Sequence, residues 1–179
     1  MAKLTPMMAQ YKEIKSQYQD AILMFRLGDF YEMFFDDAKE ASKILEITLT
    51  SRGKGGDHET PMCGVPFHAV DGYLAKLTKA GKKVAICDQV SEPNGTGIVE
   101  REVVRIVTPG TTFDDSVLNQ KSNNFVACIV EKGKQFGLAF SDITTGEFMV
   151  TELSSLKDLA AEIRRVSPAE CIAREDLLS

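Results

Sequence analysis

The chain has 179 residues, of which 44% are hydrophobic and 26% charged, as in an ordinary globular protein. Its formal net charge is −5, so it lacks the strong positive charge of many nucleic-acid-binding domains. It has no run of about 18 apolar residues for a membrane span, and residues 1–16 lack the apolar core of a signal peptide. These features predict one or two domains with a cytoplasmic location and no membrane partner.

Helices and strands alternate through residues 1–112. Thr5 and Pro6 predict the start of the first helix, because threonine caps helices and proline is tolerated in the first turn. Asp36 and Asp37 are predicted to cap the second helix, and Gly81 to end the third. The helices are expected over residues 7–18, 37–47 and 69–81, and the strands over residues 21–27, 47–50, 62–69, 82–90 and 98–111.

The composition changes after residue 112. Residues 113–124 are polar and predict a linker between a first domain, 1–112, and a second, 125–179. The second domain shows a β-β-β-α-β pattern, which is short for a complete α/β domain and predicts a fragment of a longer protein. The expected fold class is therefore α/β (α+β), with a mixed β-sheet flanked by helices in the first domain.

Common catalytic motifs are absent from the sequence. It contains no phosphate-binding loop, no Gly-x-Ser-x-Gly motif and no His-Glu-x-x-His motif. Asp142 at a strand end could serve a metal-dependent nuclease and His68 a general base, but each lacks partners and is expected to be structural. The chain is therefore predicted not to be an enzyme, with no catalytic residue and no cofactor of its own.

The four cysteines also carry no predicted chemistry. No two of them form a Cys-x-x-Cys pair, and the chain has only two histidines. We therefore expect no metal site and no disulfide, and we expect buried cysteines that pack as small apolar residues. These residues are Cys63, Cys87, Cys128 and Cys171.

The stretch GDFYEMFF, residues 28–35, is the most unusual feature of the sequence. If it is a strand, Phe30, Glu32 and Phe34 share one face, while Tyr31, Met33 and Phe35 share the other. A carboxylate beside a ring is costly in an apolar core but useful on a surface that stacks on a planar partner and accepts its hydrogen bond. Residue types alone favour an aromatic core cluster, and both interpretations stay open on that basis.

The chain resembles the N-terminal part of the MutS DNA mismatch-recognition proteins. The matching stretches are TPMMAQY, FRLGDFYEMFFDDAKEAS, LTSRG, PMCGVPFHAV, YLAKL, VAICDQV and VVRIVTPGT, which cover residues 5–112 almost continuously. Residues 122–179 are similar to the start of the family's connector domain, which has an RNase H-like fold without nuclease activity. The resemblance implies a mismatch-recognition domain followed by a truncated connector.

The resemblance also implies roles for particular residues. Phe30 is expected to enter the minor groove and stack on a mispaired or unpaired base, and Glu32 to hydrogen-bond that base. Tyr31, Met33 and Phe35 would anchor the strand, and Phe34 is left undecided. Basic residues are expected to contact the DNA backbone or groove, with a solvated basic face as the alternative for Lys54, Lys76 and Arg105. The full set is Arg52, Lys54, Lys76, Arg101 and Arg105.

Partners follow from the same resemblance. Mismatched double-stranded DNA is the expected ligand, and the full-length protein is expected to be a homodimer that uses ATP and Mg²⁺ outside this chain. The connector would contact a downstream mismatch repair protein. An alternative is that this chain serves mainly in protein contacts and binds little DNA alone.

Overall fold

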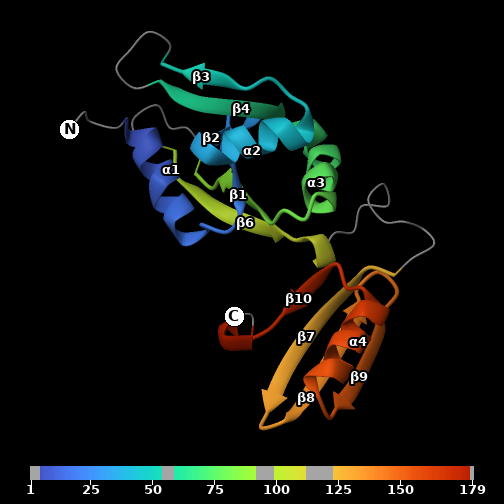
Figure 1. Cartoon of the computed structure of the whole chain (residues 1–179). Helices are drawn as coiled ribbons and strands as arrows, with labels where there is room; N and C mark the ends of the chain where they lie inside the picture. Colours follow the sequence, from blue (N-terminus) through green and yellow to red (C-terminus); the bar gives the residue numbers. More distant parts are fainter. Residues whose placement is uncertain (1–4, 54–58, 92–98, 112–122, 178–179) are drawn as a thin grey trace. The chain divides into compact units, whose positions relative to one another are not determined.

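The computed structural model describes residues 5–53, 59–91, 99–111 and 123–177. Within it the chain forms two compact units, Met1–Val107 and Thr108–Ser179, and each is described by itself (Figure 1). The predicted linker spans residues 113–124, and of these only 123 and 124 are among the described residues. The predicted mixed α+β fold class is confirmed.

The first unit is built on a mixed six-stranded sheet. Strands β1 and β5 run parallel, and all other neighbours in the order β3-β4-β2-β1-β5-β6 are antiparallel. The strands are β1 (Ile22–Leu27), β2 (Phe30–Phe34), β3 (Thr50–Arg52), β4 (Thr60–Pro66), β5 (Val84–Gln89) and β6 (Arg101–Val107). The apolar β1 and β5 thus occupy the interior of the sheet, as their continuous hydrophobic runs predict.

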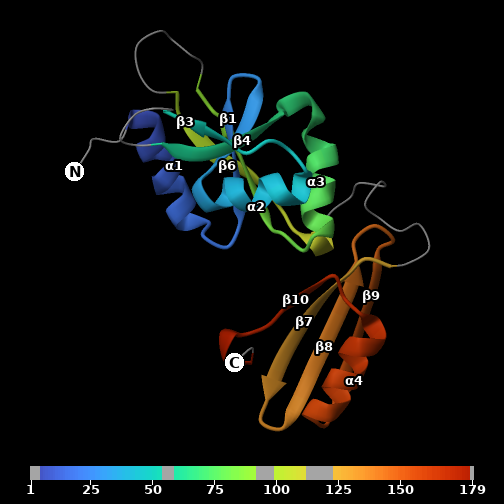
Figure 2. The same ribbon diagram turned by 45° about the horizontal axis from the view of Figure 1, so that its top comes forward.

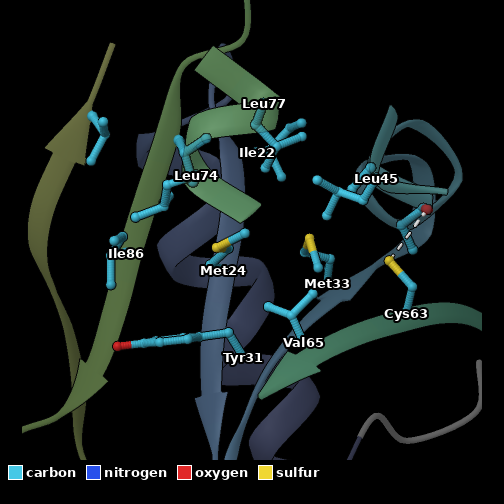
Figure 3. Packing of buried hydrophobic residues seen from close by; sticks show 14 residues of the cluster. Ile22, Met24, Tyr31, Met33, Leu45, Cys63, Val65, Leu74, Leu77 and Ile86 are labelled. Carbon is cyan, nitrogen blue, oxygen red and sulfur yellow. Dashed lines mark hydrogen bonds between the residues drawn. The ribbon is translucent and has the colours of Figure 1, made fainter. Parts of the chain in front are cut away.

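Helices cover both faces of this sheet. One face packs against α2 (Phe35–Leu45) and α3 (Val70–Lys79), and we call its buried set the α2–α3 core. Figure 2 shows both helices beside the strands, and Figure 3 shows the packing of this core around Met24 and Met33. The α2–α3 core consists mainly of Ile22, Met24, Tyr31, Met33, Leu45, Val65, Leu74, Leu77 and Ile86.

The other face packs against α1 (Pro6–Gln17). The predicted cap is confirmed, because the Thr5 hydroxyl accepts a hydrogen bond from Met8 N at 3.4 Å and Pro6 opens the helix. Tyr11 lies at the centre of this α1 core, with its ring 5.0 Å from that of Phe34 and 5.5 Å from that of Phe25. The α1 core consists mainly of Met8, Tyr11, Ile14, Leu23, Phe25, Phe34, Ala85 and Cys87.

The predicted capping of the second helix by Asp36 and Asp37 is wrong. Helix α2 starts at Phe35, and Phe34 occupies the cap position without a side-chain hydrogen bond. Asp37 is instead buried and accepts hydrogen bonds from Leu23 N at 3.0 Å and from Lys15 Nζ at 2.9 Å. Its carboxylate is turned toward these donors because a buried charge needs partners, and so it ties α1 and α2 to β1.

Strand β2 keeps the predicted alternation only as far as Phe34. Tyr31 and Met33 belong to the α2–α3 core and Phe34 to the α1 core, which decides the role left open for Phe34. Phe35 does not join Tyr31 and Met33, because it has φ 55°, begins α2 and packs against the α1 core. The helix start turns the backbone and so ends the period of two.

The second unit contains a four-stranded sheet and one α-helix. Strands β7, β8 and β9 form an antiparallel meander, and β10 pairs parallel with β7, in the predicted β-β-β-α-β order. Helix α4 packs on one face over a core centred on Leu138, Phe140 and Leu159 (Figure 1). The elements are β7 (Phe125–Lys132), β8 (Gln135–Asp142), β9 (Glu147–Leu153), α4 (Leu156–Val166) and β10 (Glu170–Ile172).

The two faces of β2 generate a stability prediction. Phe34→Ala should lower the free energy of unfolding of the first unit by about 3–5 kcal/mol, because the ring is fully buried beneath Tyr11. Phe30→Ala should change it by less than about 0.5 kcal/mol, since Phe30 is exposed. Urea unfolding followed by tyrosine fluorescence isolates this unit, because all four tyrosines lie in residues 1–107. Equal losses in the two variants would contradict the assignment of faces.

Candidate nucleic-acid interface

Phe30 is presented at the start of a strand. It follows the two-residue loop Gly28–Asp29, in which Gly28 has φ 58°, a conformation that glycine adopts without strain. The pairing of Leu27 with Phe30 closes this hairpin. The Phe30 side chain is 46% exposed, so a large apolar ring is held in solvent on a regular strand.

Glu32 lies on the same face, two residues further along β2. Directly opposite on β4 is Gly64, where an added Cβ would lie 3.5 Å from the Glu32 Cγ and 3.8 Å from the Phe30 Cδ1. Because Gly64 has no side chain, the face stays open beside both residues. Sequence reasoning missed Gly64, although its place in PMCGVPFHAV, between two strand residues that alternate inward, is the signal that marks it.

Arg52 completes this group from the edge strand β3. Its Nη1 lies 3.3 Å from the Glu32 Oε2, and its own side chain is 50% exposed. The Glu32 side chain is 18% exposed. Burial raises the pKa of the Glu32 carboxyl group above its usual range, and the positive charge of Arg52 opposes this without cancelling it. Phe30, Glu32 and Arg52 are therefore brought together on one face; we call them the reading face.

The reading face is open because α1 does not cover it. The buried set that contains Met8, Tyr11 and Ile14 of α1 includes Phe34, but it includes neither Phe30 nor Glu32. The same face of β2 is therefore buried in the α1 core at Phe34 and exposed to solvent at Phe30. Neither of the two original interpretations of GDFYEMFF is complete, because the stretch is partly core and partly surface.

Arg101 is buried rather than displayed. Only 9% of it is exposed, its Nε donates to the Arg26 carbonyl at 2.7 Å, and its Nη1 donates to the Gln10 Oε1 at 3.0 Å. Its guanidinium group also lies over the Phe25 ring, 4.9 Å from the centroid. Burial lowers the pKa of Arg101. Through these contacts Arg101 of β6 holds α1 and β1 together.

Lys76 and Arg105 lie away from the reading face. Lys76 is exposed on α3, which packs on the opposite face of the sheet. Arg105 is exposed on β6, paired with Ile86 of the α2–α3 core. Lys54 lies outside the described residues.

A polar and aromatic cluster behind Phe30 was also missed from the sequence. Arg26, Tyr31, Phe67 and Asp88 meet on the opposite face of the sheet. The available signal was Arg26 itself, a lone charge inside the apolar run AILMFRL. A charge in such a run needs partners, but the sequence does not say which distant residues supply them.

Asp142 and His68 have the expected structural settings. Asp142 is buried, and its Oδ1 accepts from both Thr144 N at 2.9 Å and the Thr144 hydroxyl at 2.6 Å, while its Oδ2 accepts from Asn124 N at 2.9 Å. Burial acts to raise the pKa of Asp142, but these hydrogen bonds outweigh it and hold that pKa below its usual range. His68 is exposed beside the Phe67 ring. Within the ranges that the structure describes, no group of three or more His, Cys, Asp or Glu residues could hold a metal ion.

The expectation of buried cysteines is only half right. Cys63 and Cys87 are buried, whereas Cys128 and Cys171 are exposed on β7 and β10. Cys128 points away from α4, because its neighbours Ala127 and Ile129 belong to the core under that helix, whereas Cys171 pairs with Ala127 but lies on the edge strand β10. All four thiols are free.

The Glu32–Arg52 pair generates a titration prediction. Arg52→Gln should raise the pKa of Glu32 further, because the opposing positive charge is removed while burial remains. The carboxyl carbon of Glu32, followed by NMR as a function of pH, reports this directly. Arg105→Gln is the matched control and should leave the Glu32 titration unchanged, since Arg105 lies on β6.

The same shift fixes the sign of a stability change. Because the folded-state pKa of Glu32 is raised, its contribution to stability is present below the unfolded-state pKa and is lost as the pH rises through the raised value. Glu32→Gln should remove that loss. A Glu32 titration at or below the usual glutamate range would contradict the buried setting.

Comparison with known proteins identifies the family. The model of MutS domain I matches residues 5–116, and that of MutS domain II matches residues 124–179. The DNA mismatch repair protein MutS of Syntrophomonas wolfei is 54% identical over 176 residues, covering 96% of this chain and 20% of that protein. The corresponding protein of Bacillus licheniformis is 52% identical over 178 residues, and that of Desulfitobacterium hafniense is 55% identical over 175, covering 99% and 97% of this chain and 20% of each relative.

This coverage bounds what the chain contains. It spans 20% of the length of these relatives, and the family models that match it are those of domains I and II. No helix among the described residues is long and apolar enough to cross a membrane. The chain belongs to the MutS family of DNA mismatch repair proteins, and it matches the family's domains I and II.

Proposed function

We propose that this chain recognises mispaired or unpaired bases in duplex DNA, with Phe30 as a wedge inserted from the minor groove and Glu32 as a hydrogen-bonding partner of the base. The observation that carries the proposal is the exposed Phe30 ring beside Glu32 on an open, glycine-lined face. Membership in a mismatch repair family supports it. DNA mismatches are therefore the substrate class that suits this surface.

The energetics of the duplex give such a wedge its selectivity. Inserting an apolar side chain between base pairs costs a few kcal/mol in lost stacking, and it costs least where pairing is already defective. Phe30 offers stacking area without any hydrogen-bonding group, so it gains similar energy on any base. Selectivity then depends on how easily the site deforms and only weakly on its sequence.

Glu32 adds a free-energy cost to DNA binding that perfect duplex does not offset. A carboxylate near phosphates is repelled, and one that is partly buried loses further solvation when DNA covers it. A displaced base can compensate by hydrogen bonding, and a carboxyl group donates when protonated and accepts when ionised. The raised pKa of Glu32 makes the protonated form easier to reach. Arg52 forms an ion pair with this carboxylate in the DNA-free protein.

The basic residues are proposed to add contacts that do not depend on sequence. Arg52 is part of the reading face, and Lys54 is two residues further along the chain. Lys76 and Arg105 are exposed cations that suit phosphate contacts only where DNA reaches the other face of the sheet. Arg101 is assigned an indirect part, because its donors are used within the protein.

Membership in the MutS family also suggests roles for domain II and for the parts of the full-length protein that lie outside this chain. We propose that the full-length protein acts in the cytoplasm as a homodimer and uses ATP and Mg²⁺ through domains outside this chain. We also propose that domain II contacts a downstream mismatch repair protein. The described residues contain no cluster of metal ligands, so no step of that chemistry is assigned to them.

A second function, protein contact through domain II, is favoured by one observation. The sheet face away from α4 exposes Val130, Phe148, Val150 and Ile172. Apolar side chains gathered in this way mark contact surfaces. This chain alone is then expected to bind DNA weakly, since few phosphate contacts are available to a chain of net charge −5.

Phe30→Ala tests the wedge. In a full-length family protein whose first 179 residues are this sequence, the substitution should make the affinities for G·T-mismatched and perfect duplex equal, a loss of about tenfold or more in discrimination. Gel-shift competition at low salt measures the ratio. The matched control is Phe148→Ala, which removes another exposed ring, that of Phe148 on β9, and should leave the ratio unchanged. Preserved discrimination in the Phe30 variant would refute the wedge.

Glu32→Gln tests the penalty. The variant should bind perfect duplex about tenfold more tightly and lose discrimination, because the repulsion is removed while a hydrogen-bonding group remains. The same competition experiment gives both affinities separately. Glu152→Gln on β9 is the control for loss of a negative charge. Weaker binding of Glu32→Gln to perfect duplex would contradict the role of Glu32.

A further inference from the structure

The loop that presents Phe30 has both of its carbonyl groups bonded. The Gly28 carbonyl accepts a hydrogen bond from the Arg26 Nε at 2.5 Å. The Asp29 carbonyl accepts one from the backbone N–H of Phe67 at 2.9 Å. A two-residue hairpin loop normally leaves such groups to water, so this loop is tied at both of its residues.

The two donors are themselves joined. The Arg26 guanidinium lies over the Phe67 ring, 3.7 Å from its centroid. One side of the loop is therefore held by an arginine and the other by the backbone of the residue on which that arginine stacks. Stacking of this kind fixes the plane of the guanidinium and thus the direction of its Nε–H.

Strand β5 supplies the counter-charge. The Asp88 Oδ1 lies 3.8 Å from the Arg26 Nη1, and both Asp88 oxygens lie 3.0 Å from the Tyr31 hydroxyl. Tyr31 follows Phe30 directly and is buried in the α2–α3 core. Arg26 is paired with Tyr31 across β1 and β2, so its side chain shares that face.

This cluster lies behind the reading face. Leu27 and not Arg26 is the partner of Phe30, and alternation places Arg26 on the face opposite to Phe30. The cluster acts on Phe30 through the backbone on either side of it, that is, through Gly28, Asp29 and Tyr31. Its members are suited to positioning and have no direct path to a base that stacks on Phe30.

We propose that Arg26, Phe67 and Asp88 form a loop clamp that positions Phe30 for insertion into DNA. An exposed ring that must displace stacked bases is effective only if its backbone does not yield, and rigidity before binding lowers the entropy lost on binding. The clamp supplies that rigidity at the one end of β2 that neither α1 nor α2 buries. This inference rests on the proposed wedge function of Phe30.

The test compares discrimination with global stability. In the full-length protein, Arg26→Gln and the milder Phe67→Leu should each reduce the ratio of Kd values for perfect and G·T-mismatched duplex by about tenfold. Arg26→Lys keeps the charge but lacks the planar group and the Nε, and it should not restore the ratio. Arg164→Gln, an exposed arginine of α4, is the matched control and should keep the ratio within about twofold.

A second readout is independent of DNA. Site-resolved hydrogen exchange should show the Phe67 amide exchanging about tenfold faster in Phe67→Leu and Arg26→Gln, because its acceptor at Asp29 moves freely. The Ile22 amide, which bonds the Lys83 carbonyl at 2.8 Å, is the internal control and should be unchanged. Equal acceleration at both amides would show that the variants only destabilise the fold, and this would overturn the proposal.

Parallel measurement of Phe30→Ala separates the two claims. If Phe30→Ala loses discrimination and the clamp variants keep it, the clamp is refuted and the wedge stands. If Phe30→Ala keeps discrimination, the wedge is refuted and the positioning role fails with it. If Phe30→Ala, Arg26→Gln and Phe67→Leu all lose discrimination, and faster exchange in the clamp variants is confined to the amide of residue 67, both the wedge and the clamp are supported.

Discussion

The burial of strand β2 on both faces at one end is the constraint on which the rest of this surface depends. Phe34 packs beneath Tyr11, while Tyr31 and Met33 pack beneath α2 and α3. A slip of one residue would exchange the two sets, so the strand has only one acceptable register. Phe30 and Glu32 inherit their orientation from these contacts, and neither residue needs to stabilise the fold itself.

Electrostatics on the reading face follow from the same arrangement. Glu32 lies partly buried because it points from a strand whose neighbours are packed, and its pKa is raised for that reason. The residue directly opposite is Gly64, which has no side chain to donate to Glu32. Arg52 reaches in from the edge strand and balances the charge only in part. A surface with an exposed ring and a poorly compensated acid is ill suited to an intact polyanion and better suited to a site that offers a hydrogen-bonding base.

The features that the sequence predicted were local ones. The capping of α1 by Thr5, the apolar runs of β1 and β5, and the alternation from Phe30 to Phe34 depend on neighbours a few residues apart. The features that it did not predict were distant contacts. Asp37 looks like a helix cap until Leu23 and Lys15 compete for it, and Phe35 looks like a strand residue until the helix begins.

The basic residues show the same limit. Arg101 resembles a surface cation in the sequence, yet Gln10 and the Arg26 carbonyl, 91 and 75 residues away, take up its donors. The clamp around Arg26 joins β1 and β5 with Phe67, the residue after β4, and no periodicity reveals these contacts. Composition was equally uninformative, because a net charge of −5 gives no sign of DNA binding.

The most direct measurement of the central claim is a crystal structure of the full-length protein bound to a duplex with one unpaired thymine. The Phe30 ring should be stacked on that thymine from the minor groove, with Glu32 within hydrogen-bonding distance of it and the Gly28–Asp29 loop unchanged. A Phe30 ring that lies outside the duplex, with the unpaired base contacted by other residues, would contradict it.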